Sequence, residues 1–181
     1  MLGWVRSIAV AVRDRSDRAR HPERRRAALR TVRRVRPSHV LFVCLGNVCR
    51  SPFAEALATN RGMSADSVGF IGPGRHPPHE ALEAARRLGV DHGGHVSRQI
   101  TDDDVEKADL IIVFDRFNVR RMADSHPAAL PKTLWLGDLD PEWTGKRAVI
   151  DPWGRGDAFF DTTFERIARC VDELRSAAES E

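Results

Sequence analysis

The stretch that decides the fold of this 181-residue chain is VLFVCLGNVCRSP, residues 40–52. Its first four residues, 40–43, form an apolar run of the length and composition typical of a buried parallel strand. Ser51 followed by Pro52 is typical of a helix N-terminus, and we expect Ser51 as the N-cap and Pro52 as the first helical residue. The stretch therefore predicts a strand, a short loop and a helix, in that order.

The loop between this strand and helix has the spacing of a phosphate-binding site. From Cys44 to Arg50 the backbone can curl around one tetrahedral anion, with N–H groups pointing inward and a helix N-terminus closing the ring. A cysteine in that position beside an arginine loses its proton more readily than a free cysteine, so Cys44 is a candidate nucleophile. The planar fork of Arg50 can hold two phosphate oxygens, and the Ser51 hydroxyl can hydrogen-bond the sulfur. The predicted phosphate-binding loop comprises Leu45, Gly46, Asn47, Val48, Cys49 and Ser51.

The same stretch resembles the active-site loop of the low-molecular-weight protein tyrosine phosphatases, and the resemblance extends to about residue 174. Three more segments match family segments in the same order: HVSRQIT at 95–101, DLIIVFD at 109–115 and DPWG at 151–154. The resemblance implies a small doubly wound, flavodoxin-like α/β domain with a four-stranded parallel sheet and helices on both faces. It also implies hydrolysis of phosphomonoesters through a phosphocysteine, with neither a cofactor nor a metal.

By this resemblance Asp151 is the general acid that protonates the leaving oxygen and the base that later activates water, while Cys44 carries the phosphoryl group. A positioned acid of this kind typically contributes a rate factor of ~10²–10⁴. Pro152 stiffens the segment, and Trp153 provides an aromatic wall beside a planar leaving group. The residues alone leave another interpretation open, because Asp-Pro-Trp-Gly is also an ordinary turn sequence.

Asn47, Ser51 and His95 are expected to support the loop rather than to react. In the family, the loop asparagine and this histidine belong to a hydrogen-bond network that holds the phosphate cradle in shape. The family also has a serine in a Ser-Ala-Gly segment at the end of the second strand, whereas this chain reads VGFIG at 68–72, which puts part of the network in doubt. The remaining histidines are expected in solvated loops, among them His76, His79 and His92.

The three cysteines form neither a disulfide framework nor a metal-binding pattern, because Cys44 and Cys49 share one loop and Cys170 lies far away in the predicted terminal helix. This distribution indicates a reducing compartment, and we expect a cytoplasmic protein. Family members with a second cysteine five residues after the nucleophile close a reversible disulfide, and Cys49 has that position. A small buried core residue is the other interpretation of Cys49, and Cys170 is expected to be buried and inert.

Length and patterning indicate one packed domain, residues 38–178, after an arginine-rich extension, residues 1–37, that is partly helical or disordered. No run of apolar residues is long enough to span a membrane. A terminal helix is predicted after an N-cap at Asp157, because apolar residues recur there at helical spacing. The predicted strands cover 40–44, 67–71, 110–114 and 133–136, and the helices between them cover 53–61, 80–88 and 117–123.

Charge separates the extension from the domain. The extension holds twelve arginines against three acidic residues and so carries +9, which leaves −6 for the rest of a chain whose net charge is +3. Its apolar residues at 27–29, 32 and 35 share one helical stripe. Such a basic helix can bind an anionic surface or an acidic partner, whereas nucleic acid is not expected. Alternatively, the extension is a solvated tail that packs one helix on the domain.

The sequence thus predicts a protein tyrosine phosphatase that acts on a phosphotyrosine-bearing protein, with a bacterial tyrosine kinase as one candidate. A protein arginine phosphatase is the first alternative, although arginine phosphatases of this fold have a threonine where this chain has the apolar Val48. An arsenate reductase is a weaker alternative, because such enzymes need further cysteines in a mobile segment. A non-catalytic phosphate-binding module is another, but the intact set of Cys44, Arg50 and Asp151 argues against it.

Overall fold

The computed structural model describes the backbone of residues 2–180 and the side chains of residues 17–180. Its strands are β1 (Val40–Cys44), β2 (Ala65–Gly69), β3 (Leu110–Val113) and β4 (Thr133–Trp135). Its helices are α1 (Leu2–Val35), α2 (Arg50–Asn60), α3 (His79–Arg87), α4 (Asp102–Lys107), α5 (Arg116–Ser125) and α6 (Asp157–Glu179), with the 3-10 helices η1 (Pro127–Lys132) and η2 (Leu136–Asp138).

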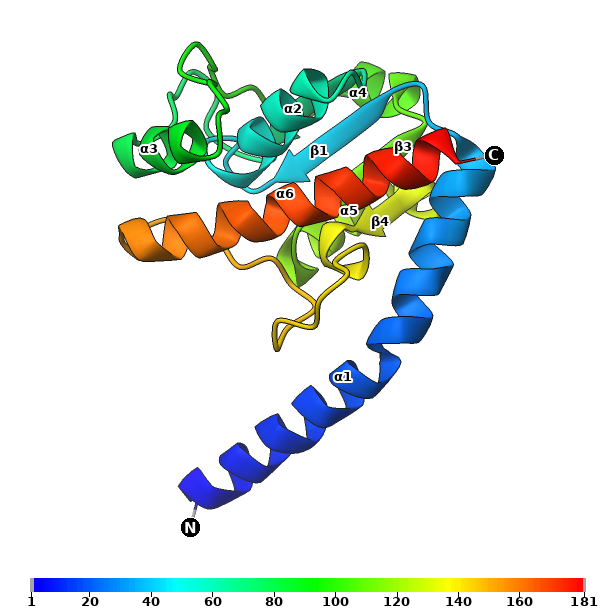
Figure 1. Cartoon of the computed structure of the whole chain (residues 1–181), viewed down its shortest axis with the longest axis vertical. Coiled ribbons are helices and arrows are strands. Elements are labelled where there is room, and N and C mark those ends of the chain that lie inside the picture. The colour runs from blue at the N-terminus through cyan, green and yellow to red at the C-terminus, as the bar shows by residue number, and fades with distance from the viewer. Residues whose placement is uncertain (1, 181) are drawn as a thin grey trace.

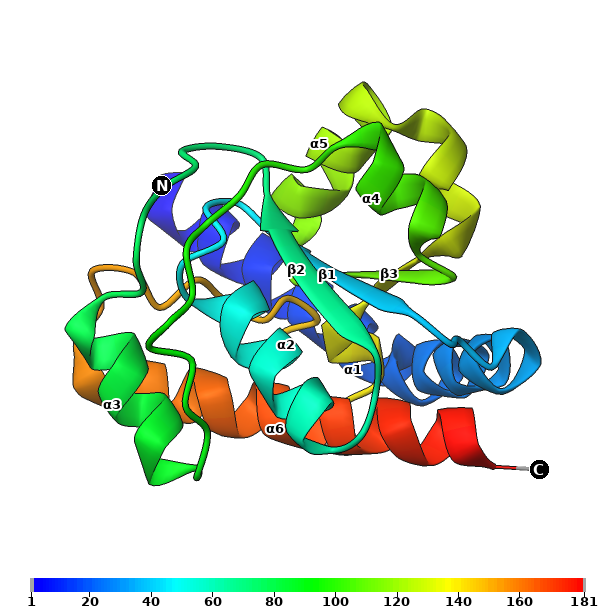
Figure 2. The same ribbon diagram turned by 90° about the horizontal axis from the view of Figure 1, so that it is seen from above.

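The four strands are all parallel and form one sheet in the order β2-β1-β3-β4 (Figure 1). Helices lie on both faces of this sheet, with α2, α3 and α6 on one side of the strands and α4 and α5 on the other (Figure 2). The predicted doubly wound, flavodoxin-like α/β fold is therefore confirmed.

The apolar run at residues 40–43 lies in the central strand β1, as the sequence predicts. All its residues are buried, because it lies between β2 and β3 and is covered on both faces. Phe42 and Cys44 belong to the apolar cluster that contains α2, α3 and α6, whereas Leu41 and Val43 belong to the cluster on the face of α4 and α5. A strand covered in this way must be apolar along its whole length rather than alternating.

The second strand differs from the prediction by two residues, since β2 covers Ala65–Gly69 rather than 67–71. Its first residues, Ala-Asp-Ser, are too polar to mark a strand in the sequence, so the prediction followed the more apolar residues after it. Pairing with β1 sets the true register and places Cys44 opposite Gly69. This register also brings the side chain of Ser67 to the nucleophile loop, where it accepts a hydrogen bond from Asn47.

Both predicted helix caps are wrong. The N-cap of α2 is Cys49, so Ser51 lies inside the first turn and Pro52 is the third helical residue. A proline is tolerated there because the N–H groups of the first turn have no intrahelical acceptor. The N-cap of α6 is Gly156, at a φ of +79°, and Asp157 is the first helical residue. Its carboxylate is still favourable there, near the positive end of the helix dipole.

The helix α1 extends well beyond the sheet and bends partway along its length (Figure 1). Pro22 lies inside this helix, and it removes one backbone hydrogen bond, which accounts for a bend. Farther along, Ala28, Leu29 and Val32 are buried in the same apolar cluster as residues of α6. This part of the extension packs on the domain. Within residues 2–180, no helix is long and apolar enough to cross a membrane.

Candidate active site

The nucleophile loop, residues 44–50, lies at the carboxyl end of β1, where the neighbouring strands β2 and β3 lie on opposite sides. Open α/β sheets bind their ligands at such switch points. The loop curls back on itself, because the N–H of Asn47 donates to Cys44 Sγ over 3.2 Å. The N–H groups of Gly46 and Val48 have no acceptor among the described residues, so an anion inside the ring can accept from them.

The sulfur of Cys44 is buried and lies 3.0 Å from the hydroxyl oxygen of Ser51. That oxygen accepts a hydrogen bond from Asn47 Nδ2 at 3.0 Å, so the serine proton is left to donate. Its acceptors are the sulfur and, at 3.4 Å, the more distant carbonyl of Val68. With the N–H of Asn47, the sulfur can therefore receive two hydrogen bonds, and both stabilise a thiolate.

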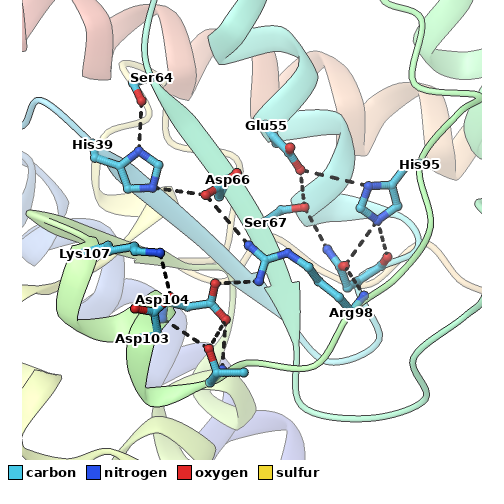
Figure 3. A network of polar contacts seen from close by, with 12 residues as sticks. His39, Glu55, Ser64, Asp66, Ser67, His95, Arg98, Asp103, Asp104 and Lys107 are labelled. Carbon is cyan, nitrogen blue, oxygen red and sulfur yellow. Dashed lines mark hydrogen bonds and ion pairs between the residues drawn. The ribbon is translucent and has the colours of Figure 1, made fainter.

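Asn47 is the hub of this network. It is fully buried and has a φ of +51°, a left-handed conformation that asparagine tolerates better than most residues. Its Nδ2 also donates to Ser67 Oγ at 2.8 Å, and its Oδ1 accepts from the backbone N–H of Arg98 at 2.9 Å. Ser67 in turn donates to Glu55 Oε2 at 2.5 Å (Figure 3). A continuous chain of hydrogen bonds thus runs from the sulfur to Glu55.

Ser67 corrects the expectation that the second strand lacks the family serine. The segment Ser67-Val68-Gly69 ends β2, and the serine hydroxyl accepts a hydrogen bond from the side chain of Asn47. The expectation compared residues 68–72 with the family's Ser-Ala-Gly segment, whereas the matching segment is residues 67–69 at the end of β2. The Ser-x-Gly spacing at 67–69 is the signal that would have found this residue.

His95 supports the same asparagine. Its Nε2 lies 2.9 Å from the Asn47 carbonyl oxygen and 3.2 Å from Asn47 Oδ1, and since both are acceptors, Nε2 carries the proton. Burial lowers the pKa of His95, which keeps the ring neutral and leaves Nδ1 without a proton. Nδ1 lies 4.0 Å from Glu55 Oε2 (Figure 3).

Arg50 is almost completely buried and joins two carboxylates. Its Nη1 donates to Asp115 at 2.6 Å and to the carbonyl of Val149 at 3.0 Å, while its Nη2 donates to Asp151 at 2.7 Å. Burial alone lowers the pKa of Arg50, but Cys44, Asp151 and Asp115 raise it by more, so the guanidinium stays charged. Its Nε has no protein partner among the described residues, and this leaves one buried donor for a phosphate oxygen.

A pocket of about 200 Å³ opens over the loop. Trp153 and Ile71 contribute large exposed apolar side chains to it, and the guanidinium of Arg75 donates to the carbonyl of Gly46 at 2.8 Å. Arg75 therefore ties the segment after β2 to the nucleophile loop. The pocket is lined by Cys44, Leu45, Gly46, Val48, Cys49, Ile71, Arg75, Asp151 and Trp153.

The structure brings the three predicted catalytic candidates together, since Arg50 donates a hydrogen bond to Asp151 and lies in the same loop as Cys44. Sequence reasoning missed four polar residues of the site: Ser67, Glu55, Arg75 and Asp115. Asp115 had a signal, because it follows β3 at the same edge of the sheet as the loop. Glu55 and Arg75 had none, because their roles depend on contacts between separate segments.

Cys49 and Cys170 are both free and buried. Burial raises the pKa of both thiols, and for Cys49 the charges of Asp151 and Cys44 add to the effect, so both are neutral at pH 7. His92, predicted in a solvated loop, is instead buried beside Phe53. Burial lowers the pKa of His92 to about 4. Among the described side chains, no group of three or more His, Cys, Asp or Glu could hold a metal ion.

Comparison with known proteins gives one consistent family. A family model described as "Low molecular weight phosphotyrosine protein phosphatase" matches residues 39–181. The human protein of that name is 36% identical over 145 residues, which cover 72% of this chain and 89% of the human protein. The low molecular weight protein-tyrosine-phosphatase Ptp of Acinetobacter johnsonii is 33% identical over 136 residues, which cover 74% and 92% of the two chains.

Solved structures lead to the same fold. The tyrosine phosphatase AmsI of Erwinia amylovora superposes with a TM-score of 0.72 at 25% identity, over 79% of this chain and 94% of that chain. The YwlE arginine phosphatase of Geobacillus stearothermophilus superposes with a TM-score of 0.69, also at 25% identity, over 77% and 91%. Because the family model matches well over half of the chain, the sequence prediction is confirmed: this chain belongs to the low molecular weight phosphotyrosine protein phosphatase family.

Proposed function

We propose that this phosphoric monoester hydrolase acts on phosphotyrosine in proteins through a phosphocysteine on Cys44. One observation carries the proposal: the Cys44 sulfur, with two donors directed at it, lies in a pocket that Asp151 also lines. A nucleophile and an acid facing one cavity are what the transfer of a phosphoryl group from a phenol requires.

In the first step, the Cys44 thiolate attacks phosphorus while the bond between phosphorus and the tyrosyl oxygen breaks. The unpartnered Nε of Arg50 and the free N–H groups of the loop bind the phosphoryl oxygens on which charge is carried. Asp151 donates its proton to the departing oxygen, so the product is a neutral phenol. Trp153 and Ile71 offer apolar surface to the ring.

In the second step, Asp151 is ionised and takes a proton from a water molecule that attacks the phosphorus of the phosphocysteine. The phosphorus–sulfur bond breaks, inorganic phosphate is released and the Cys44 thiolate is restored. The hydrogen bond from Ser51 stabilises the sulfur as it leaves. Asn47, His95 and Ser51 act by holding the loop in shape rather than by reacting.

A protein arginine phosphatase on the same scaffold is the alternative substrate assignment, and the similarity to the arginine phosphatase of Geobacillus stearothermophilus favours it. Against it stands Val48, whose apolar side chain lines the pocket and cannot hydrogen-bond a guanidinium. Phosphotyrosine is therefore the proposed substrate, and a bacterial tyrosine kinase is one candidate for the protein that carries it.

Cys49 is proposed as the partner of Cys44 in a reversible disulfide that protects the nucleophile from further oxidation. Both thiols are free and share one short loop, which supports the proposal. A thiol nucleophile of this kind works under reducing conditions, so we propose a cytoplasmic location.

We further propose that residues 38–178 carry the catalytic residues and that residues 1–37, through their exposed arginines, bind an anionic surface or an acidic partner. The family match begins at residue 39, which supports this division. Charge supports the second part, because the exposed arginines of α1 include Arg18, Arg20, Arg26, Arg30, Arg33 and Arg34.

The test is phosphate release from para-nitrophenyl phosphate, a phosphotyrosine peptide and phosphoarginine, measured with reductant and a metal chelator present. We expect turnover of the aryl phosphates, its loss in Cys44→Ser and a strong reduction in Asp151→Asn. Preference for phosphoarginine would change the substrate and keep the mechanism. Absence of turnover with all three would contradict the proposal.

A further inference from the structure

The segment that leads to Asp151 has no regular secondary structure. Between the end of η2 at Asp138 and the start of α6 at Asp157, the chain forms neither a helix nor a strand. The position of the proposed general acid therefore depends on side chains that reach this segment from elsewhere. Two buried clusters supply them, one around Arg166 and one around Asp138.

Arg166 projects from α6 and is only 8% exposed. Its Nη1 donates to the carbonyl of Ala148 at 2.8 Å and its Nη2 to the carbonyl of Lys146 at 2.7 Å. Its Nε donates at 2.7 Å to Asp140, a fully buried carboxylate that neutralises the charge. One guanidinium thus clamps two backbone carbonyls just before Asp151, which only the planar fork of an arginine can do.

Asp138 holds the same segment from η2. Both of its oxygens accept from Arg147, Oδ1 from Nε at 2.8 Å and Oδ2 from Nη2 at 2.6 Å. The chain passes so close to Gly137 that a Cβ there would lie 1.9 Å from the Arg147 carbonyl oxygen. Asp138 Oδ1 also accepts from Arg24 of α1 at 3.2 Å, so the N-terminal helix takes part in this cluster.

The clamped segment continues directly into the active site. The N–H of Val149 donates to the Phe114 carbonyl at 2.8 Å, and the Val149 carbonyl accepts from Arg50. The same guanidinium of Arg50 binds the Asp151 carboxylate. A shift of residues 146–149 would therefore move both the phosphate-binding arginine and the proposed proton donor.

We propose that Arg166 and Asp138 are positioning residues for the general acid, and that α1 contributes to this function through Arg24. The inference rests on the proposed role of Asp151. It gives the N-terminal helix a function in the chemistry, separate from any partner that its exposed arginines bind. A misplaced acid slows only those reactions whose leaving group needs a proton, so the effect must depend on the ester.

The experiment is kcat/KM for a series of aryl phosphates, from dinitrophenyl phosphate to phenyl phosphate, whose leaving phenol has a pKa of ~10. Arg166→Lys keeps the charge but not the fork. We expect its kcat/KM to fall about 10-fold on phenyl phosphate and less than about 2-fold on dinitrophenyl phosphate. The ~10-fold fall is only part of the ~10²–10⁴-fold that a general acid supplies. Arg24→Met should show the same pattern more weakly, with kcat/KM on phenyl phosphate falling about 3-fold relative to dinitrophenyl phosphate.

Arg87→Lys is the matched control, because Arg87 is another arginine that donates two side-chain hydrogen bonds, in its case to Asp161 of α6 and outside the clamped segment. Its leaving-group dependence should equal that of the unaltered enzyme. An equal fall of kcat/KM on every ester, or no fall in either Arg166→Lys or Arg24→Met, would overturn the inference. Should Arg166→Lys fail to fold, Arg24→Met decides, since that side chain lies at the edge of the cluster.

Asp151→Asn separates this inference from the proposed function. Its kcat/KM should depend on the leaving group more steeply than that of any other variant. If Asp151→Asn has the leaving-group dependence of the unaltered enzyme, the general-acid role itself is wrong. If Asp151→Asn behaves as expected and the arginine variants do not, only the positioning role fails.

Discussion

Replacement of Asn47 tests how much the hydrogen-bond network contributes to the nucleophile loop. The side chain makes four contacts: Nδ2 donates to Ser51 and Ser67, and Oδ1 accepts from the Arg98 backbone and from His95. All four disappear in Asn47→Gly and in Asn47→Ala. The two variants differ in one respect, because glycine adopts the φ of +51° without strain and alanine does not.

The contacts set the expected magnitude. Each intramolecular hydrogen bond contributes about 0.5–1.5 kcal/mol, so Asn47→Gly should lower the free energy of unfolding by about 2–6 kcal/mol. A left-handed alanine costs about 1–2 kcal/mol, and glycine loses about 0.5–1 kcal/mol more conformational entropy on folding. Because these two effects oppose each other, Asn47→Ala should be less stable than Asn47→Gly by up to about 1.5 kcal/mol.

Urea unfolding at pH 7 measures these free energies, and alkylation by iodoacetamide reports on the sulfur. Without Asn47 Nδ2, the Ser51 hydroxyl is free to turn away from Cys44, so the thiolate is less stabilised and alkylation at pH 7 should slow. The buried Cys49 stays a neutral thiol and does not compete. A free energy of unfolding within about 0.5 kcal/mol of the unaltered protein for both variants would refute the network argument. Greater stability of the alanine variant would refute the strain argument.

Three further predictions concern other parts of the site and core. Arg75→Met removes the donor to the Gly46 carbonyl, so inhibition by inorganic phosphate should weaken about 3- to 10-fold; an unchanged inhibition constant would show that this tie does not shape the loop. His92 has a pKa of about 4 in the fold, below its ordinary ~6.5, so between these pH values the unfolded chain binds a proton that the folded chain does not. The free energy of unfolding should therefore have its full value above pH ~6.5 and fall by up to about 3 kcal/mol toward pH ~4. His92→Leu should remove this dependence in urea unfolding at several pH values, and an unaltered pH dependence would contradict the assignment. Gly137→Ala places a Cβ 1.9 Å from the Arg147 carbonyl oxygen, so it should lower the melting temperature and reduce kcat/KM most on phenyl phosphate; wild-type values for both would show that the close approach is absent.

The most local parts of the structure were predictable. β1, the loop and α2 lie within 21 consecutive residues, and each depends on short-range properties: a continuous apolar run, a Cys-to-Arg spacing and a proline in the first helical turn. The same holds for Asp151 and Trp153, whose short segment was identified as a unit and which the structure places in one pocket with Cys44. Their catalytic roles remain predictions.

Errors arose where neighbours in space decide the outcome. β2 begins with polar residues, and pairing with β1 rather than its own pattern places Ser67 beside Asn47. His92 has polar chemistry but is enclosed by Phe53 and Phe164. Ser51 is not the N-cap because the helix begins two residues earlier than predicted, and its hydroxyl instead lies against the sulfur.

By itself, the sequence determined the fold class, the family and the chemical identity of the loop, because apolar runs and closely spaced functional residues are properties of the chain. Only the tertiary structure decided what holds Asp151 in place, since Arg24, Asp138 and Arg166 are separated by 114 and 28 positions and meet in one region of the fold. Hydrogen bonds act over about 3 Å whatever the distance along the chain. For that reason, a long-range polar cluster leaves no pattern in one sequence, whereas a strand or a phosphate loop does.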